Sequence, residues 1–180
     1  EHFKVIVGVP SVYLLHQTYQ EFLNFGISEQ QLGRMGDGYS LDPSKAVIIS
    51  TVATLYSEAT NSEDQFYQQV DCLFFDEAHH TSAFTWYNVI DSMETEYIFG
   101  VSASPFYGDK EHLLQDLLVR GAIGPIIHKV EQRDLVESGY ISRPYIFVVS
   151  SWSDSNIKFL IDWQPLYKTG IVNNKSRNRL

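Results

Sequence analysis

Short apolar runs alternate with amphipathic stretches along most of the chain. The runs are rich in β-branched and aromatic residues, which is typical of strands that are buried on both faces of a parallel sheet. The clearest predicted strands are Lys4–Val9, Ala46–Ser50, Asp71–Phe75 and Tyr97–Val101, and two weaker ones are Pro125–Val130 and Pro144–Ser150.

The stretches between these runs carry apolar residues at helical spacing. The first helix is predicted from Val12, with Ser11 as its N-cap and Gly26 as its stop. Thr81 and Ser82 are predicted to cap a later helix. The remaining predicted helical segments are Val52–Ser57, Phe84–Met93, Lys110–Val119, Gln132–Ser138 and part of Leu166–Leu180, and Gly33–Tyr39 is predicted as loop. Strands that alternate with helices predict an α/β fold, with a mainly parallel sheet flanked by helices.

The 180 residues are enough for one domain with a core of its own. The character of the chain changes after Ser150, where polar, asparagine-rich and basic stretches follow. We therefore expect a domain over residues 1–150 and a connection to another domain over residues 151–180.

Composition narrows the function classes. The formal net charge of −9 argues against nucleic-acid binding through a broad basic surface, so any such contact must use backbone amides and helix N-termini. No apolar run reaches the roughly 18 residues of a membrane span, and no signal-peptide pattern opens the sequence. The single cysteine, Cys72, lies in a predicted strand, which favours a buried thiol in the reducing cytoplasm, or in the host cytoplasm for a phage-encoded protein.

The strongest chemical signal is a buried strand that ends in two adjacent carboxylates, Asp76 and Glu77. Ligands of open α/β sheets bind beyond the carboxyl ends of the strands. In an ATPase, one such acid holds Mg²⁺ through water and the other activates the attacking water. The alternative is that the strand stops here because charged residues are not buried.

Five segments in order resemble the motifs of the first RecA-like domain of a superfamily 2 helicase or translocase with a DEAH motif. The likeness is greatest to the branch of DNA-repair, phage and restriction enzymes. The segments are Val9-Pro10-Ser11, Ile49-Ser50-Thr51, Asp76-Glu77-Ala78-His79, Gly100–Pro105 and the stretch from Gly124 to Pro144. The resemblance implies a RecA-like P-loop NTPase fold that binds ATP and Mg²⁺ and acts on DNA.

By this resemblance, Asp76 holds Mg²⁺ through water and Glu77 is the general base for ATP hydrolysis. His79 links the nucleotide site to the motif around Ser102 and Ser104, two hydroxyls on the nucleotide side that couple the phosphate state to domain movement. A plain turn at a strand end is the alternative for these serines.

The resemblance also places Pro10, Ser11 and Thr51 on the nucleic-acid backbone. A hydroxyl and free amides at a helix start bind phosphate without a positive side chain, although plain helix capping is the alternative. Gln17 and Arg34 are further candidates. His79 and His80 do not predict a zinc site, because adjacent histidines on an extended segment point to opposite sides and no cysteine partner is present.

The phosphate-cradling loop of this family is expected upstream of the first strand, so we expect an N-terminally truncated domain. Gly170–Ser176 is not a substitute, because Asn174 stands where the second glycine is needed and a helical segment precedes it. The arginine finger is expected from a second RecA-like domain of the same parent chain. We therefore expect the printed chain to be inactive by itself.

These observations favour the N-terminal ATPase domain of an ATP-dependent DNA helicase or translocase. Two alternatives stay open: the motor subunit of a restriction endonuclease, and a non-catalytic nucleic-acid-binding remnant. The intact Asp76, Glu77 and His79 argue against the remnant.

Overall fold

The computed structural model describes residues 3–61, 66–93, 95–146 and 162–174. Two compact units divide the chain, residues 1–127 and residues 128–180. The expected boundary between residues 150 and 151 stays a prediction. The first unit contains the sheet and every residue proposed above for a site.

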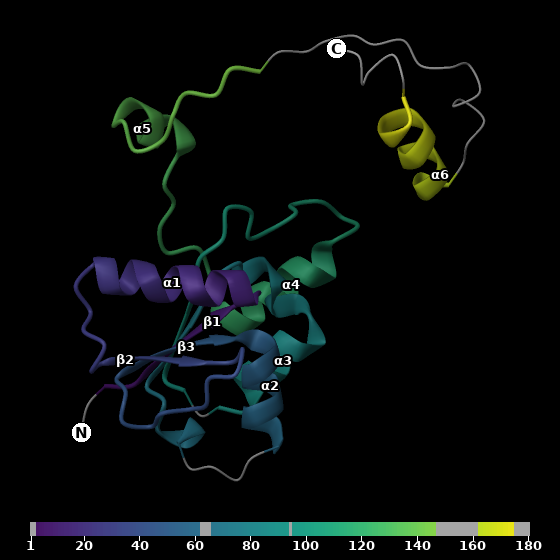
Figure 1. Cartoon of the computed structure of the whole chain (residues 1–180). Coiled ribbons are helices and arrows are strands. Elements are labelled where there is room, and N and C mark those ends of the chain that lie inside the picture. Colours follow the sequence, from purple (N-terminus) through teal and green to yellow (C-terminus); the bar gives the residue numbers. More distant parts are fainter. Residues whose placement is uncertain (1–2, 62–65, 94, 147–161, 175–180) are drawn as a thin grey trace. The chain divides into compact units, whose positions relative to one another are not determined.

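The sheet of the first unit has five strands, and every pair of neighbours is parallel (Figure 1). The strand order is β2-β3-β1-β4-β5. The bounds are β1 Val5–Val9, β2 Leu32–Met35, β3 Val47–Thr51, β4 Cys72–Phe75 and β5 Tyr97–Gly100. The α/β fold with a parallel sheet is thus confirmed, and so are the four clearest strands.

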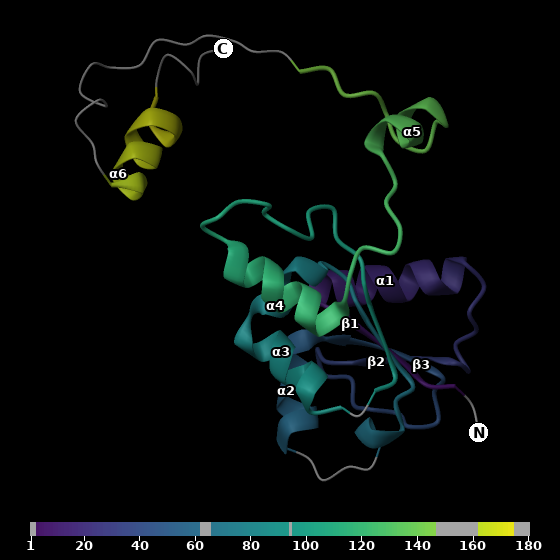
Figure 2. The same cartoon turned by 180° about the vertical axis from the view of Figure 1, so that it is seen from behind.

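Helices cover both faces of the sheet, with α1 on one side and α2 and α3 on the other (Figures 1 and 2). Their bounds are α1 Val12–Asn24, α2 Val52–Asn61, α3 Phe84–Asp91 and α4 Leu113–Ile123. Leu15 of α1 packs on Val7, Val9 and Ile49, whereas Leu55 and Trp86 pack with Ile6 and Phe75 on the opposite face. Alternation along each strand therefore supplies two apolar faces, as expected for a fully buried parallel sheet.

The expectation of a loop over Gly33–Tyr39 is wrong for its first part, which belongs to strand β2. Leu32 and Met35 are 1% and 2% exposed, and the strand pairs with β3 along its length. Gly33 within the strand and Gly36 directly after it obscured this strand in the sequence, because glycine is a poor strand former. The turn at Gly36–Tyr39 is present as predicted.

A strand over Pro125–Val130 is also wrong, because the backbone there is irregular. Ile126 and Ile127 are 52% and 79% exposed, so no buried face rewards an extended conformation. Of the predicted strand Pro144–Ser150, residues 144–146 are irregular and the rest lies outside the described residues.

The second unit contains short helical elements in or beside the segments where helix was expected. These are α5 Gln132–Glu137, α6 Trp163–Tyr167 and the π-helical turn η4 Lys168–Val172. Gly139 follows α5 with φ 77°, the left-handed conformation that ends a helix at low cost with glycine. None of the helices in the described ranges is both long and apolar enough to cross a bilayer.

One part of the sheet has no cover among the described residues. On β5 and just beyond it, Tyr97, Phe99 and Val101 lie on the same side and are 45%, 39% and 48% exposed. Phe99 is in register with Phe74, which packs in the cluster around α1. The α1 side of the sheet is thus covered over β1 and β3 but open at β5.

Cys72 is buried in β4, as the sequence indicated. Burial raises the pKa of its thiol, and the Asp71 carboxylate raises it further, because both disfavour the thiolate. Since the thiolate is the reactive form, the native chain should be alkylated by iodoacetamide much more slowly than the chain in urea at about pH 8.5, where a free thiol is half ionised. Mass spectrometry of timed samples measures both rates, and equal rates would show that the thiol is accessible.

Candidate functional site

All five strands point the same way, so their carboxyl ends meet at one edge of the sheet. Gly8, Phe75 and Gly100 lie level with one another on β1, β4 and β5. Two further backbone hydrogen bonds extend this alignment past the strands: the Asp76 amide donates to the Gly8 carbonyl at 3.0 Å, and the Ala78 amide donates to that of Val101 at 2.9 Å. The segments after β4 and β5 are therefore fixed to each other.

Asp76 and Glu77 stand at this edge, immediately after β4. Oδ1 of Asp76 accepts a hydrogen bond from the Glu77 amide at 2.9 Å, and its other oxygen accepts none from the described residues. Glu77 has a left-handed backbone (φ 53°, ψ 48°), and its side chain is 42% exposed. Both carboxylates are therefore accessible to a ligand. They fit a Mg²⁺ ion held through water, since this ion takes few protein ligands and keeps several waters.

His79 joins the two segments through its side chain. Its Nδ1 lies 3.2 Å from Glu77 Oε2 and 3.0 Å from Ser102 Oγ. The contact with Ser102 is a hydrogen bond, and the contact with Glu77 is a close approach of the ring nitrogen to the carboxylate. Ser102 Oγ also accepts from the Ser104 amide at 3.2 Å. The structure thus brings Glu77, His79 and Ser102 together, while the Ser104 contribution is its backbone.

The expectation that His79 and His80 point to opposite sides is wrong. They lie on a 3₁₀ turn, η2 Ala78–Ser82, and not on an extended segment, so their rings lie side by side, with centroids 4.1 Å apart and planes tilted by 38°. His80 in turn lies 5.6 Å from the Trp86 ring. Among the described residues no group of three or more His, Cys, Asp or Glu side chains could hold a metal ion.

The expected capping of α3 by Thr81 and Ser82 is also wrong. The Thr81 hydroxyl is buried and donates to the Ala78 carbonyl at 2.7 Å, inside η2. The N-cap position belongs to Ala83, which has no side-chain acceptor. The 3₁₀ turn thus uses the hydroxyl that the sequence offered to the helix.

The residues proposed for nucleic acid lie at the ends of β1 and β3. Pro10 and Ser11 are exposed, and Ser11 Oγ accepts from the Leu14 amide at 3.3 Å. Thr51 is 6% exposed and its hydroxyl accepts from the Thr54 amide at 3.2 Å. Both side chains therefore cap a helix, the alternative noted from the sequence. The described residues contain no side-chain contact between this group and Asp76 or Glu77.

Sequence reasoning missed one residue behind this edge, the buried Asp116 of α4. Its two carboxylate oxygens accept from the Tyr107 and Gly108 amides, both at 2.9 Å. This fastens the segment that follows Ser104 to the helix. The partners are eight and nine residues away, so no local motif signals the contact.

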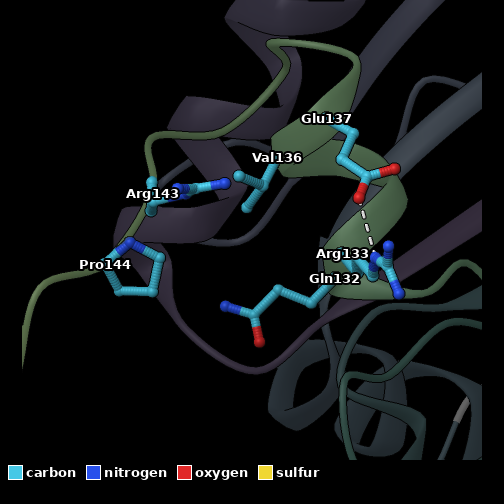
Figure 3. A pocket seen from close by; sticks show the side chains of 6 residues that line it. All are labelled: Gln132, Arg133, Val136, Glu137, Arg143 and Pro144. Atoms are coloured by element: carbon cyan, nitrogen blue, oxygen red, sulfur yellow. Dashed lines mark hydrogen bonds and ion pairs between the residues drawn. The ribbon is translucent and has the colours of Figure 1, made fainter.

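A shallow pocket of the second unit lies around α5 (Figure 3). In it Arg133 Nε and Glu137 Oε1 form an ion pair at 2.7 Å. Its lining residues are Gln132, Arg133, Val136, Glu137, Arg143 and Pro144. No residue of the predicted site is among them, so this pocket does not bear on the site at the sheet edge.

Known structures share the fold. The helicase domain of Hef from Pyrococcus furiosus matches with a TM-score of 0.56 and 17% identity, over 71% of this chain and 29% of that chain. The UvsW helicase from bacteriophage T4 matches with a TM-score of 0.55 and 20% identity, over 69% of this chain and 43% of that chain. Our chain thus spans less than half the length of either helicase chain. No curated protein matches it.

The parallel sheet and its matches define a RecA-like α/β fold. Residues 1–107, more than half of the chain, match the model of one family, described as the res subunit of type III restriction enzymes. The chain belongs to this family, which is superfamily 2 helicase-like.

Proposed function

We propose that the chain is the first ATPase domain of an ATP-dependent DNA helicase or translocase, of the DEAH-type branch that includes repair, phage and restriction enzymes. The observation that carries the proposal is the contact of His79 with both Glu77 and Ser102. This contact connects the acidic pair after β4 to the Ser102 hydroxyl after β5. A nucleotide-dependent motor needs such a connection between the nucleotide site and the neighbouring segment.

In this proposal Asp76 and Glu77 divide the chemistry. Asp76 holds Mg²⁺ through water, and its Oδ2 is available for this because the described residues donate a hydrogen bond only to Oδ1. Glu77 accepts the proton of the hydrolytic water, a task that suits an accessible carboxylate. Bound ATP and Mg²⁺ supply the reacting phosphoryl group and its charge neutralisation.

His79, Ser102 and Ser104 transmit the state of the site. A shift of the Glu77 carboxylate changes the distance to His79 Nδ1, and His79 is hydrogen-bonded to Ser102. The Ser104 amide donates a hydrogen bond to Ser102 Oγ and so moves with this hydroxyl. The segment after β5 therefore moves with the acidic pair, and a second RecA-like domain can sense that movement.

A phosphate-binding loop and the second domain belong to the parent protein in this proposal. Two observations support that view. The chain covers 29% and 43% of the helicase chains that share its fold, and the β5 side of the sheet has apolar side chains without cover in the described residues. A strand and helix that carry the loop would bury Tyr97, Phe99 and Val101.

The nucleic-acid track runs over Pro10, Ser11 and Thr51. Exposed amides at the start of α1 bind a phosphate without a positive side chain, which agrees with the net charge of −9. Capping by Ser11 is compatible with this, because a hydroxyl that accepts from an amide keeps its own proton to donate. The Thr51 hydroxyl also lies 2.8 Å from the Thr54 hydroxyl, so the two share a hydrogen bond.

The deciding experiment is Mg²⁺-dependent ATP hydrolysis with and without DNA. It compares this chain with a longer protein that adds the preceding segment and the second domain. We expect turnover, stimulated by DNA, only in the longer protein. Turnover in the chain alone would refute our account of the phosphate site, and silence in both would favour the non-catalytic remnant.

A second candidate is the motor subunit of a restriction endonuclease, which the family description favours. It shares the ATPase chemistry, so hydrolysis does not separate the two. A DNA-cleavage assay on the longer protein does: ATP-dependent double-strand breaks support the restriction motor, and translocation without cleavage supports the free-standing helicase.

A further inference from the structure

Five side chains form a cluster around Arg34 at the β2 edge of the sheet, on the side that α1 covers. We name it the Arg34 cluster: His16, Tyr19, Arg34, Asp37 and Tyr39. The guanidinium carbon lies 4.0 Å from the ring centroids of both Tyr19 and Tyr39. One of its nitrogens, Nη1, donates to His16 Nδ1 at 3.2 Å. The plane of the guanidinium is therefore fixed by two rings and one hydrogen bond.

The hydrogen bonds define the state of His16. Arginine only donates, so His16 Nδ1 must accept and the ring proton lies on Nε2. Nε2 then donates to Asp37 Oδ2 at 2.8 Å. Asp37 thus orients the imidazole but forms no ion pair with Arg34, and no other described carboxylate forms one. No carboxylate of the described residues therefore neutralises the guanidinium charge. Four of its five N–H groups have no acceptor among the described residues.

A tight turn holds this cluster against the proposed nucleic-acid face. Gly36 and Tyr39 exchange backbone hydrogen bonds of 2.9 and 3.1 Å, and Asp37 and Gly38 between them have φ values of 52° and 83°. A Cβ at Gly36 would lie 2.8 Å from Thr54 Oγ1 and 3.6 Å from Thr51 Oγ1. The turn therefore lies beside Thr51. On the other side, His16 follows Ser11 by five residues on α1, about 7.5 Å along the helix axis.

We propose that Arg34 binds a backbone phosphate of the nucleic acid and extends the track of Pro10, Ser11 and Thr51 to the β2 edge. This rests on the proposed function. The three track residues are uncharged, so Arg34 supplies the cation that the face otherwise lacks. A planar guanidinium matches two phosphate oxygens, and prior fixation by Tyr19 and Tyr39 lowers the entropy lost on binding. If the role of Arg34 were only to hold β2 against α1, its replacement would leave the nucleic-acid affinity unchanged.

The test is fluorescence anisotropy of a labelled single-stranded oligonucleotide, titrated with the chain over a series of salt concentrations. We expect Arg34→Gln to weaken binding about tenfold, because it removes a hydrogen bond to a charged group. We also expect it to reduce the slope of log K against log salt by about 0.7, the value for one phosphate contact of a single strand. The matched control is Lys45→Gln, which removes an equal charge just before β3, at the amino ends of the strands, where the ammonium donates to the Glu29 carbonyl at 2.8 Å. It should change neither quantity.

A second variant covers the case in which Arg34→Gln loosens the fold. Circular dichroism detects such loosening. Arg34→Lys then decides whether Arg34 binds the phosphate, because lysine keeps a cation near both tyrosines but lacks the planar guanidinium that matches two phosphate oxygens. For Arg34→Lys we expect the same dependence of log K on log salt as for the unaltered chain, but weaker binding. Equal affinity of Arg34→Lys and the unaltered chain, or equal losses in Arg34→Gln and Lys45→Gln, would overturn the inference alone. No binding by the unaltered chain would overturn the proposed track as well.

Discussion

Replacement of Glu77 by Gln should reduce ATP turnover by about 10²–10⁴-fold in a protein that carries this chain with its phosphate loop, and should preserve ATP binding. Glutamine has the shape of glutamate but accepts no proton from water. Its amide oxygen can keep the contact with His79 Nδ1, which lies 3.2 Å from Glu77 Oε2, and the hydrogen bond from the residue 77 amide to Asp76 is unaffected. Phosphate release measures turnover, and titration with a fluorescent ATP analogue measures binding.

Glu21→Gln is the matched control, since it makes the same chemical change at an exposed position of α1. It should leave turnover unaltered. If Glu77→Gln hydrolyses ATP at the original rate, Glu77 is not the base. If it loses ATP binding instead, the carboxylate holds the nucleotide complex and Asp76 becomes the better candidate for the base.

The parallel sheet was predictable because its strands are buried on both faces. Such strands need apolar side chains at nearly every position, so β1, β3, β4 and β5 stand out as apolar runs. Strand β2 does not, because Gly33 and Arg34 occupy half of it. It is a strand because its backbone pairs with β3 and its outer residues are buried, and both conditions arise only in the folded chain.

The meeting of Asp76, Glu77, His79 and Ser102 was predictable from topology, because parallel strands bring their carboxyl ends to one edge. The direction of the His79 and His80 rings was not, since it depends on a 3₁₀ turn that no local signal announced. The Arg34 cluster was beyond sequence reasoning for another reason. His16 and Arg34 are 18 residues apart, and their contact depends on how α1 lies on the sheet.

Replacement of Phe75 by Ala should cost about 3–5 kcal/mol in the free energy of unfolding, a large part of the stability of a small domain. The ring is fully buried, and its centroid lies 5.4 Å from that of Trp86. Gly8 is level with it on β1, and a Cβ there would lie 2.8 Å from the ring, so the ring occupies the space that the glycine leaves. Urea denaturation followed by circular dichroism measures the loss.

Phe99→Ala is the matched control, because it removes the same ring from the neighbouring strand β5, where 39% of the residue is exposed. In this chain its cost should be well below that of Phe75→Ala, since less apolar area leaves water when Phe99 folds. In the longer protein the two costs should approach each other, because the proposed additional strand and helix would bury Phe99. Equal costs in the short chain would contradict the packing around Phe75. A small cost of Phe99→Ala in the longer protein would instead show that the β5 side stays open, and that the phosphate loop joins the sheet elsewhere.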